Sequence, residues 1–108
     1  MKETPFKLLV EYASSPGKHR ALTFAKDRVS IGRAQSNDVK LTNSMRLVSR
    51  QHAEIRREKG GFWIVDLGSK NATLLNGRRI EADRPYALQH GDRFVLGDFQ
   101  IEFVADAS

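Results

Sequence analysis

Hydrophobic residues alternate with polar ones along most of this chain. In the first apolar segment, Phe6, Leu8, Val10 and Tyr12 share one face of a predicted strand, with charged side chains between them. The same period of two recurs at short intervals, and residues typical of turns separate the segments. The predicted strands are 6–12, 20–24, 28–31, 38–41, 53–57, 62–66, 73–75, 78–80, 86–88, 93–96 and 99–104.

About eleven short strands without a helix predict an all-β sandwich or barrel. Both faces of 62–66 are apolar, so we expect that strand to be buried on both sides. Asn76-Gly77 lies between two apolar runs and predicts a tight hairpin, because a type I′ turn needs positive φ at both central residues. The aromatic residues with core spacing are Phe62, Trp63, Phe94 and Phe103.

Length and composition limit the classes of protein. With 108 residues the chain fits one domain, which we place at 1–104, followed by a short tail or the start of a linker at 105–108. The absence of cysteine excludes a disulfide framework and a thiolate zinc site. His19 and His90 have no partner at metal-ligand spacing, so we expect them on the surface and expect neither a metal nor a cofactor.

No apolar run approaches the roughly 20 residues that a membrane span needs. The first residues also lack the apolar region of a secretory signal. We therefore expect a soluble, unprocessed protein that does not bind membranes, and the lack of cysteine fits the cytoplasm. The formal net charge is +5, which favours an anionic partner. Charge alone leaves nucleic acid, a phosphopeptide and an acidic protein surface open.

Three predicted loops carry groups suited to one particular anion. Arg33 follows the strand 28–31, Ser49-Arg50 precede the strand 53–57, and Lys70-Asn71 follow the strand 62–66. A phosphorylated side chain carries a charge of roughly −1.5 to −2 and three acceptor oxygens near neutral pH. Arginine meets two of those oxygens at once, and hydroxyls supply short directional donors. We predict that the three loops meet at one edge of the β domain and hold a phosphorylated side chain.

The order and spacing of these motifs resemble those of a forkhead-associated (FHA) domain. The motifs are Gly32-Arg33, then Ser49-Arg50-Gln51-His52-Ala53, then the run from Asp66 to Thr73, and then Asn76-Gly77. The likeness extends from about Val29 to Phe103. It implies an eleven-stranded β-sandwich of two mostly antiparallel sheets that binds phosphothreonine peptides through loops at one end.

The resemblance also implies roles for single residues. Arg33 and Ser49 correspond to the family's phosphate ligands, and Arg50 corresponds to a side chain that reaches the peptide or the phosphate. Asn71 corresponds to the asparagine that holds the peptide backbone. Gly32 and His52 are expected to shape the site without touching the ligand.

This chain departs from the family pattern at two positions. Lys70 stands where many members have a threonine that contacts the phosphate, and its ammonium can supply charge there instead. Ala72 stands where many members have glycine. If the backbone at this position needs positive φ, alanine destabilises the fold by about 1 kcal/mol relative to glycine. The loop from Thr42 to Leu47 is also slightly long for the family.

Two features of the sequence fit functions other than phosphothreonine binding. Ser49 beside His52 suggests a catalytic pair, but the chain has no Gly-x-Ser-x-Gly elbow and no acid placed to orient the ring. We therefore expect a non-enzymatic domain in which His52 is buried and bonded to the loop backbone. A nucleic-acid-binding β domain fits the charge, but no exposed aromatic pair is predicted and the basic residues are mixed with acids.

The expected partner is a threonine-phosphorylated protein or peptide, with a Ser/Thr protein kinase acting upstream in signalling or assembly. A remaining alternative is a scaffold that keeps the fold and docks an unphosphorylated partner, because Lys70 and Ala72 change the loop.

Overall fold

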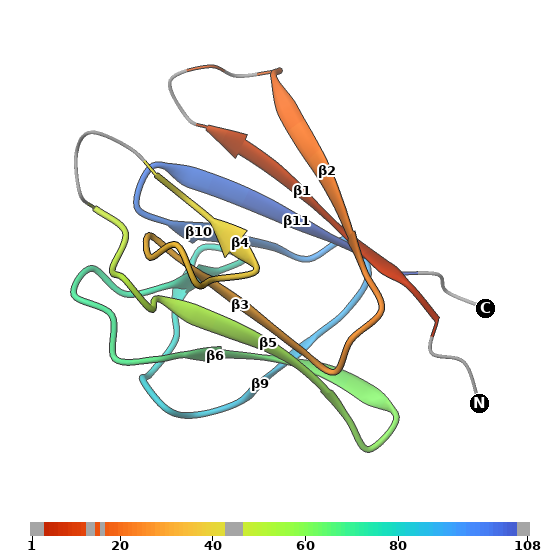
Figure 1. The fold of residues 1–108 in the computed structure, drawn as a ribbon. Helices are drawn as coiled ribbons and strands as arrows, with labels where there is room; N and C mark the ends of the chain where they lie inside the picture. The colour runs from red at the N-terminus through yellow and green to blue at the C-terminus, as the bar shows by residue number, and fades with distance from the viewer. Residues whose placement is uncertain (1–3, 13–14, 16, 43–46, 106–108) are drawn as a thin grey trace.

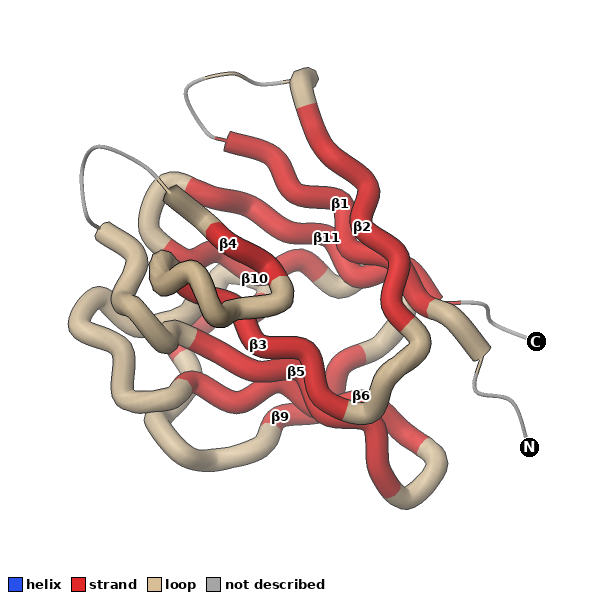
Figure 2. The backbone as a smooth tube through the Cα atoms, in the orientation of Figure 1, coloured by secondary structure: helices blue, strands red, loops and turns tan. Residues whose placement is uncertain are grey.

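A computed structural model of the chain describes residues 4–12, 15, 17–42 and 47–105. Within these residues it contains eleven strands and no helix, as the period of two predicts (Figure 2). The strands are β1 (Phe6–Tyr12), β2 (His19–Phe24), β3 (Arg28–Gly32), β4 (Val39–Lys40), β5 (Ala53–Glu58), β6 (Gly61–Asp66), β7 (Leu74–Leu75), β8 (Arg78–Arg79), β9 (Tyr86–Leu88), β10 (Arg93–Leu96) and β11 (Phe99–Ala105).

The strands form two sheets that pack face to face (Figure 1). One sheet has six strands in the order β2-β1-β11-β10-β7-β8, and the other has five in the order β4-β3-β5-β6-β9. All strand pairs are antiparallel except β3 with β4. The predicted sandwich of two mostly antiparallel sheets is thus confirmed.

The core lies between the two sheets and uses the inward phase of each strand. Phe6, Leu8 and Val10 are buried, as the alternation in the first strand predicts. Near the end where the chain termini lie, the ring of Phe62 packs 5.1 Å from that of Phe6 and 4.8 Å from that of Phe103, measured between centroids. The guanidinium of Arg57 covers the Phe62 ring at 4.8 Å and closes this end of the core.

Two hairpin turns follow from local sequence. Asn76 and Gly77 have φ values of 49° and 86°, which confirms the predicted tight turn between β7 and β8. Lys59 and Gly60 have φ values of 54° and 76° and connect β5 to β6 in the same way. Glycine adopts positive φ at no steric cost, so the position of Gly60 and of Gly77 determines where each hairpin reverses direction.

The prediction that β6 is buried on both sides was wrong for Trp63. Ile64, Val65 and Asp66 are buried, but Trp63 is half-buried on the outer face, where its indole Nε1 donates to the Glu58 carbonyl at 3.2 Å. Val65 lies on the same outer face and is buried, so the prediction holds for that end of the strand. The ring of Trp63 lies farther along this face and keeps part of its surface in water. Phe62 is also half-buried, although it packs against the core.

The C-terminal strand extends one residue beyond its predicted end. β11 runs to Ala105, which pairs with Phe6 of β1 and so belongs to the sheet and not to the predicted tail. Residues 106–108 of the predicted tail and 43–46 of the loop predicted to be long lie outside the described residues. No helix in the described part of the chain is long and apolar enough to cross a membrane.

Candidate phosphopeptide-binding site

The sheet topology brings the three predicted loops to one edge. β5 lies between β3 and β6 and runs antiparallel to both, so the end of β3, the start of β5 and the end of β6 are neighbours. The register pairs Ile31 with Ala53 and Ala53 with Asp66, which defines the last row of this sheet. The loops beyond this row gather at the left of Figure 1, and the chain termini lie at the right.

The first two loops meet through backbone groups. The amide of Arg33 donates to the Ser49 carbonyl at 3.0 Å, and the amide of Ala34 donates to the Arg50 carbonyl at 3.2 Å. Gly32 is buried, and a Cβ at this position would overlap the Arg50 carbonyl oxygen. Glycine is therefore needed here for close approach of two backbone segments. This agrees with the expected supporting role of Gly32.

The half-buried Arg33 side chain is anchored in the same place. Its Nε donates to the Val48 carbonyl at 3.1 Å. Among the described residues this bond uses only Nε, so the two terminal nitrogens, with two N–H donors each, are left for a ligand. Arg50 is 17 residues after Arg33 in the sequence, yet its backbone packs against Gly32, the neighbour of Arg33.

The hydroxyl of Ser49 connects the second loop to the third. Its Oγ accepts a hydrogen bond from the Lys70 amide at 2.9 Å. A hydroxyl that accepts from a backbone amide still has its own proton to donate to an anion. In the same loop Asn71 donates from Nδ2 to the Leu47 carbonyl at 3.0 Å. Lys70, Asn71 and Arg50 are exposed, and Arg33 and Ser49 are half-buried. The loops that carry these five predicted binding residues are joined to one another by the hydrogen bonds above.

His52 is fully buried beneath the loops. Its Nδ1 accepts from the Ser49 amide at 3.1 Å, and its Nε2 lies 2.8 Å from the Ala72 carbonyl. An acceptor at Nδ1 and a carbonyl at Nε2 require the neutral ring with its proton on Nε2. Burial lowers the pKa of His52 below 6.5, although the Ala72 carbonyl and Asp66 act in the opposite direction. The expected buried, backbone-bonded role of His52 is confirmed.

Asp66 organises the third loop and was not predicted as a site residue. Its Oδ2 accepts from the amides of Gly68 and Ser69 at 3.0 and 2.9 Å, and its Oδ1 accepts from the hydroxyls of Ser69 and Thr73 at 2.6 and 2.7 Å. Burial alone would raise the pKa of Asp66, but these hydrogen bonds outweigh it and lower the pKa below 3.8. An aspartate that accepts from the backbone amide two residues later, here that of Gly68, is a local turn signal, so the sequence contained the information.

The free energy of unfolding of the ligand-free domain should decrease as the pH is lowered below about 6.5. The folded state holds the pKa of His52 below its ordinary value, so the unfolded state binds more protons in the window between the two values. The contribution of neutral His52 to stability is complete above its ordinary pKa of 6.5. It is lost as the pH falls through the lower pKa that His52 has in the folded state. The pKa values of Asp38 and Asp66 are lowered from 3.8, so their stabilising contributions disappear only at more acidic pH.

Urea unfolding between about pH 8 and pH 5 measures this dependence. The free energy of unfolding should change less steeply with pH in His52→Gln, because glutamine does not titrate in this range. An equal slope in both proteins would contradict the assignment to His52.

Ala72, which stands where many family members have glycine, adopts the left-handed backbone conformation that favours glycine. Its φ is 68°, and its carbonyl is the acceptor for His52. Alanine in this region is strained by roughly 1–2 kcal/mol. The geometry therefore fixes the position of the carbonyl at the cost of local strain.

Ala72→Gly is expected to raise the free energy of unfolding by about 0.5–1 kcal/mol, since relief of strain exceeds the entropy that glycine adds to the unfolded chain. Chemical denaturation measures the difference. The matched control is Ala21→Gly in the exposed, extended β2, which should destabilise the domain. Loss of stability in both variants would show that Ala72 is not strained.

Asn37 and Gly97 are further supporting residues that sequence reasoning missed. The buried Asn37 amide donates to the Arg50 carbonyl at 2.7 Å and to the Ala34 carbonyl at 3.0 Å. Gly97, with φ of 56°, lies where a Cβ would come within 2.9 Å of the Leu47 Cβ. Both contacts join segments distant in sequence, and a single polar residue or glycine in a loop gives no signal for them.

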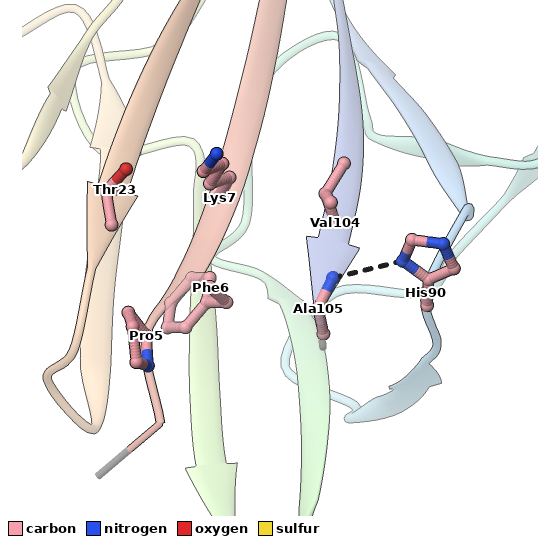
Figure 3. A pocket seen from close by; sticks show the side chains of 7 residues that line it. All are labelled: Pro5, Phe6, Lys7, Thr23, His90, Val104 and Ala105. Carbon is pink, nitrogen blue, oxygen red and sulfur yellow. Dashed lines mark hydrogen bonds between the residues drawn. The ribbon is translucent and has the colours of Figure 1, made fainter. Parts of the chain in front are cut away.

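A surface hollow at the other end of the molecule has different chemistry (Figure 3). Its volume is about 430 Å³, and its lining includes Phe6, Val104, Ala105 and His90, with Lys7 as its one lysine. His90 is exposed, as expected, and its Nδ1 accepts from the Ala105 amide at 3.2 Å. Since the lining is mostly apolar, this hollow lacks the several converging donors that a phosphate group needs.

Two known proteins with similar sequences are named as an inhibitor and a regulator. The chain is 36% identical over 90 residues to the oxoglutarate dehydrogenase inhibitor of Corynebacterium diphtheriae, which covers 82% of this chain and 59% of that protein. It is 37% identical over 75 residues to the glycogen accumulation regulator GarA of Mycolicibacterium smegmatis, covering 69% and 44% of the two proteins. The chain thus spans about half the length of these relatives.

Solved structures share the fold closely. A structure from a study of phosphothreonine-dependent FHA domain interactions superposes with a TM-score of 0.76 at 25% identity, covering 94% of this chain and 99% of that one. Mycobacterium tuberculosis EmbR, in complex with a low-affinity phosphopeptide, gives a TM-score of 0.77 at 25% identity, covering 94% and 25%. The FHA domain family model matches residues 29–97. The chain therefore belongs to the FHA domain family, whose members are phosphothreonine-peptide-binding modules.

Proposed function

We propose that this domain binds a phosphothreonine side chain of a partner protein at the edge formed by its three loops. Arg33, Ser49, Arg50 and Lys70 donate to the phosphate, and Asn71 holds the backbone of the bound peptide. The observation that carries the proposal is the convergence at Ser49, whose carbonyl accepts from the Arg33 amide and whose hydroxyl accepts from the Lys70 amide. These contacts join the three loops at one residue, which supports a common site for their donors.

The charges of the site suit a dianion. Arg33, Arg50 and Lys70 supply cationic groups from three separate loops. The nearby carboxylate of Asp66 is 3% exposed and accepts four hydrogen bonds, so it is shielded from a bound phosphate. Charge-assisted hydrogen bonds to a phosphate are about twice as strong as neutral ones, which lets a small site bind selectively.

The domain acts by binding rather than by catalysis, in a process controlled by a Ser/Thr protein kinase that phosphorylates the partner. Support comes from the relatives, one named as an enzyme inhibitor and the other as a regulator. His52 is committed to two backbone bonds and is fully buried, so it is not placed to act as a base for Ser49. The expected compartment is the cytoplasm, where kinases modify such partners.

A library of threonine-phosphorylated peptides tests this function, with matched unphosphorylated and phosphoserine peptides as controls. We expect binding to phosphothreonine peptides and its loss after phosphatase treatment. If the threonine methyl group enters an apolar recess, phosphoserine should bind about fourfold more weakly, because one buried methyl contributes about 0.8 kcal/mol. Equal binding before and after phosphatase treatment would instead indicate a scaffold for unphosphorylated partners.

A further inference from the structure

We propose, on the basis of the proposed function, that the partner segment carries acidic side chains beside its phosphothreonine, on the side that lies over Arg20 and Lys40. The argument rests on a basic rim, which we define as the exposed residues Arg20, Lys40, Arg50 and Lys70. It extends the positive charge beyond what one phosphate group requires.

The rim is continuous with the phosphate-binding residues. In the parallel pairing of β3 with β4, Lys40 is the register partner of Gly32, the residue before Arg33. The backbone of Arg50 packs against Gly32 from the other side, and the Lys70 amide is bonded to the Ser49 hydroxyl. Lys40 therefore lies on the strand next to β3, opposite the residue that precedes Arg33.

Arg20 continues the rim onto the other sheet. It pairs with the inward-facing Val10, so it lies on the same face of β2 as Leu22 and Phe24, at the edge of the sheet. From there its Nη2 donates to the Lys40 carbonyl at 3.4 Å, across the gap between β2 and β4. The Lys40 ammonium donates to the neutral Gln35 side chain at 3.2 Å, and within the described part of the chain it forms no ion pair.

The acidic residues around the rim do not cancel this charge. Asp38 is paired with Lys26 at 2.7 Å and accepts from the Ser30 amide, and Asp66 is buried. Asp98 differs, because it follows Gly97 in the turn that packs against Leu47. Its negative charge acts on that part of the edge, so the preference for acidic residues should be confined to the side of the peptide over Arg20 and Lys40.

The test uses phosphothreonine peptides with three flanking glutamates, lysines or neutral residues on either side, together with their unphosphorylated counterparts. The expected result is an affinity about fivefold higher for glutamate than for neutral residues on one side only, and weaker binding for lysine there. The double variant Arg20→Gln with Lys40→Gln should lower the glutamate-to-neutral ratio toward one. The matched control is Lys7→Gln with Arg28→Gln, which removes the same charge from the opposite end and should keep the ratio.

Several outcomes separate this inference from the proposed function. If phosphorylated peptides with neutral flanks bind but glutamate flanks give no gain, the inference fails and phosphothreonine binding stands. If no phosphorylated peptide binds, the proposed function fails as well. Equal gains on both sides, or a gain without phosphate, would overturn the preference stated here. Tighter binding of single-stranded RNA, lost in the Arg20 and Lys40 double variant, would identify the rim as a nucleic-acid surface instead.

Discussion

Arg33→Ala is expected to weaken binding of a phosphothreonine peptide by roughly 100-fold, or about 3 kcal/mol. The variant removes a charged group that is half-buried and is oriented by its hydrogen bond to the Val48 carbonyl. A phosphate that loses such a partner keeps its desolvation penalty without the compensating hydrogen bonds. Titration calorimetry or fluorescence anisotropy with the best peptide from the library measures the change.

The control for this variant is Arg28→Ala. Arg28 is exposed and begins β3, the strand that Arg33 follows, so it lies at the end away from the loops. Its replacement by alanine changes the net charge by the same amount as Arg33→Ala. It should leave the affinity nearly unchanged. A second variant, Arg33→Lys, should recover only part of the binding, since an ammonium does not reproduce the planar fork. Full affinity in a correctly folded Arg33→Ala protein would refute the proposed phosphate site.

His52→Ala is expected to lower the free energy of unfolding by about 3–4 kcal/mol and also to weaken peptide binding. The substitution empties a fully buried volume and leaves the Ser49 amide and the Ala72 carbonyl without their partner. Both groups belong to loops that carry proposed ligands, so the loss of stability and the loss of affinity have one cause. Denaturant unfolding measures the first effect, and binding at a temperature well below the melting point measures the second.

His19→Ala is a suitable comparison, because His19 is exposed on β2. It should change stability by no more than about 0.5 kcal/mol. If His52→Ala unfolded too readily for binding to be measured, His52→Gln would retain part of the packing and allow the measurement. An unchanged melting temperature in His52→Ala would contradict the structural role of this residue.

The strands were predictable because each depends on local sequence. Alternation such as that of Phe6, Leu8 and Val10 determines which side of a strand faces the core, whatever its neighbours are. The Asn76-Gly77 turn is also local, because positive φ at both residues is a property of these residue types. Trp63 was placed wrongly for a related reason: apolar character predicts burial only where another layer covers that face.

The residues that hold the site together were predicted only in part. The family resemblance pointed to Gly32 and His52, and the structure supplies the physical reason in each case, namely close backbone approach and a pair of hydrogen bonds. Asn37 and Gly97 were missed because their partners, the Arg50 carbonyl and Leu47, are far away along the chain. Such contacts leave no periodic pattern in the sequence.

By itself, the sequence determined the strands, two of the hairpin turns and the identity of the groups able to bind a phosphate, because periodicity, turn chemistry and side-chain charge are properties of short segments. The tertiary structure decided that β5 lies between β3 and β6, and therefore that Arg33, Ser49 and Lys70 meet at one edge. It also placed Arg20 beside Lys40 across two sheets. These arrangements depend on strand order, which is set by the packing of the whole core and not by any single segment.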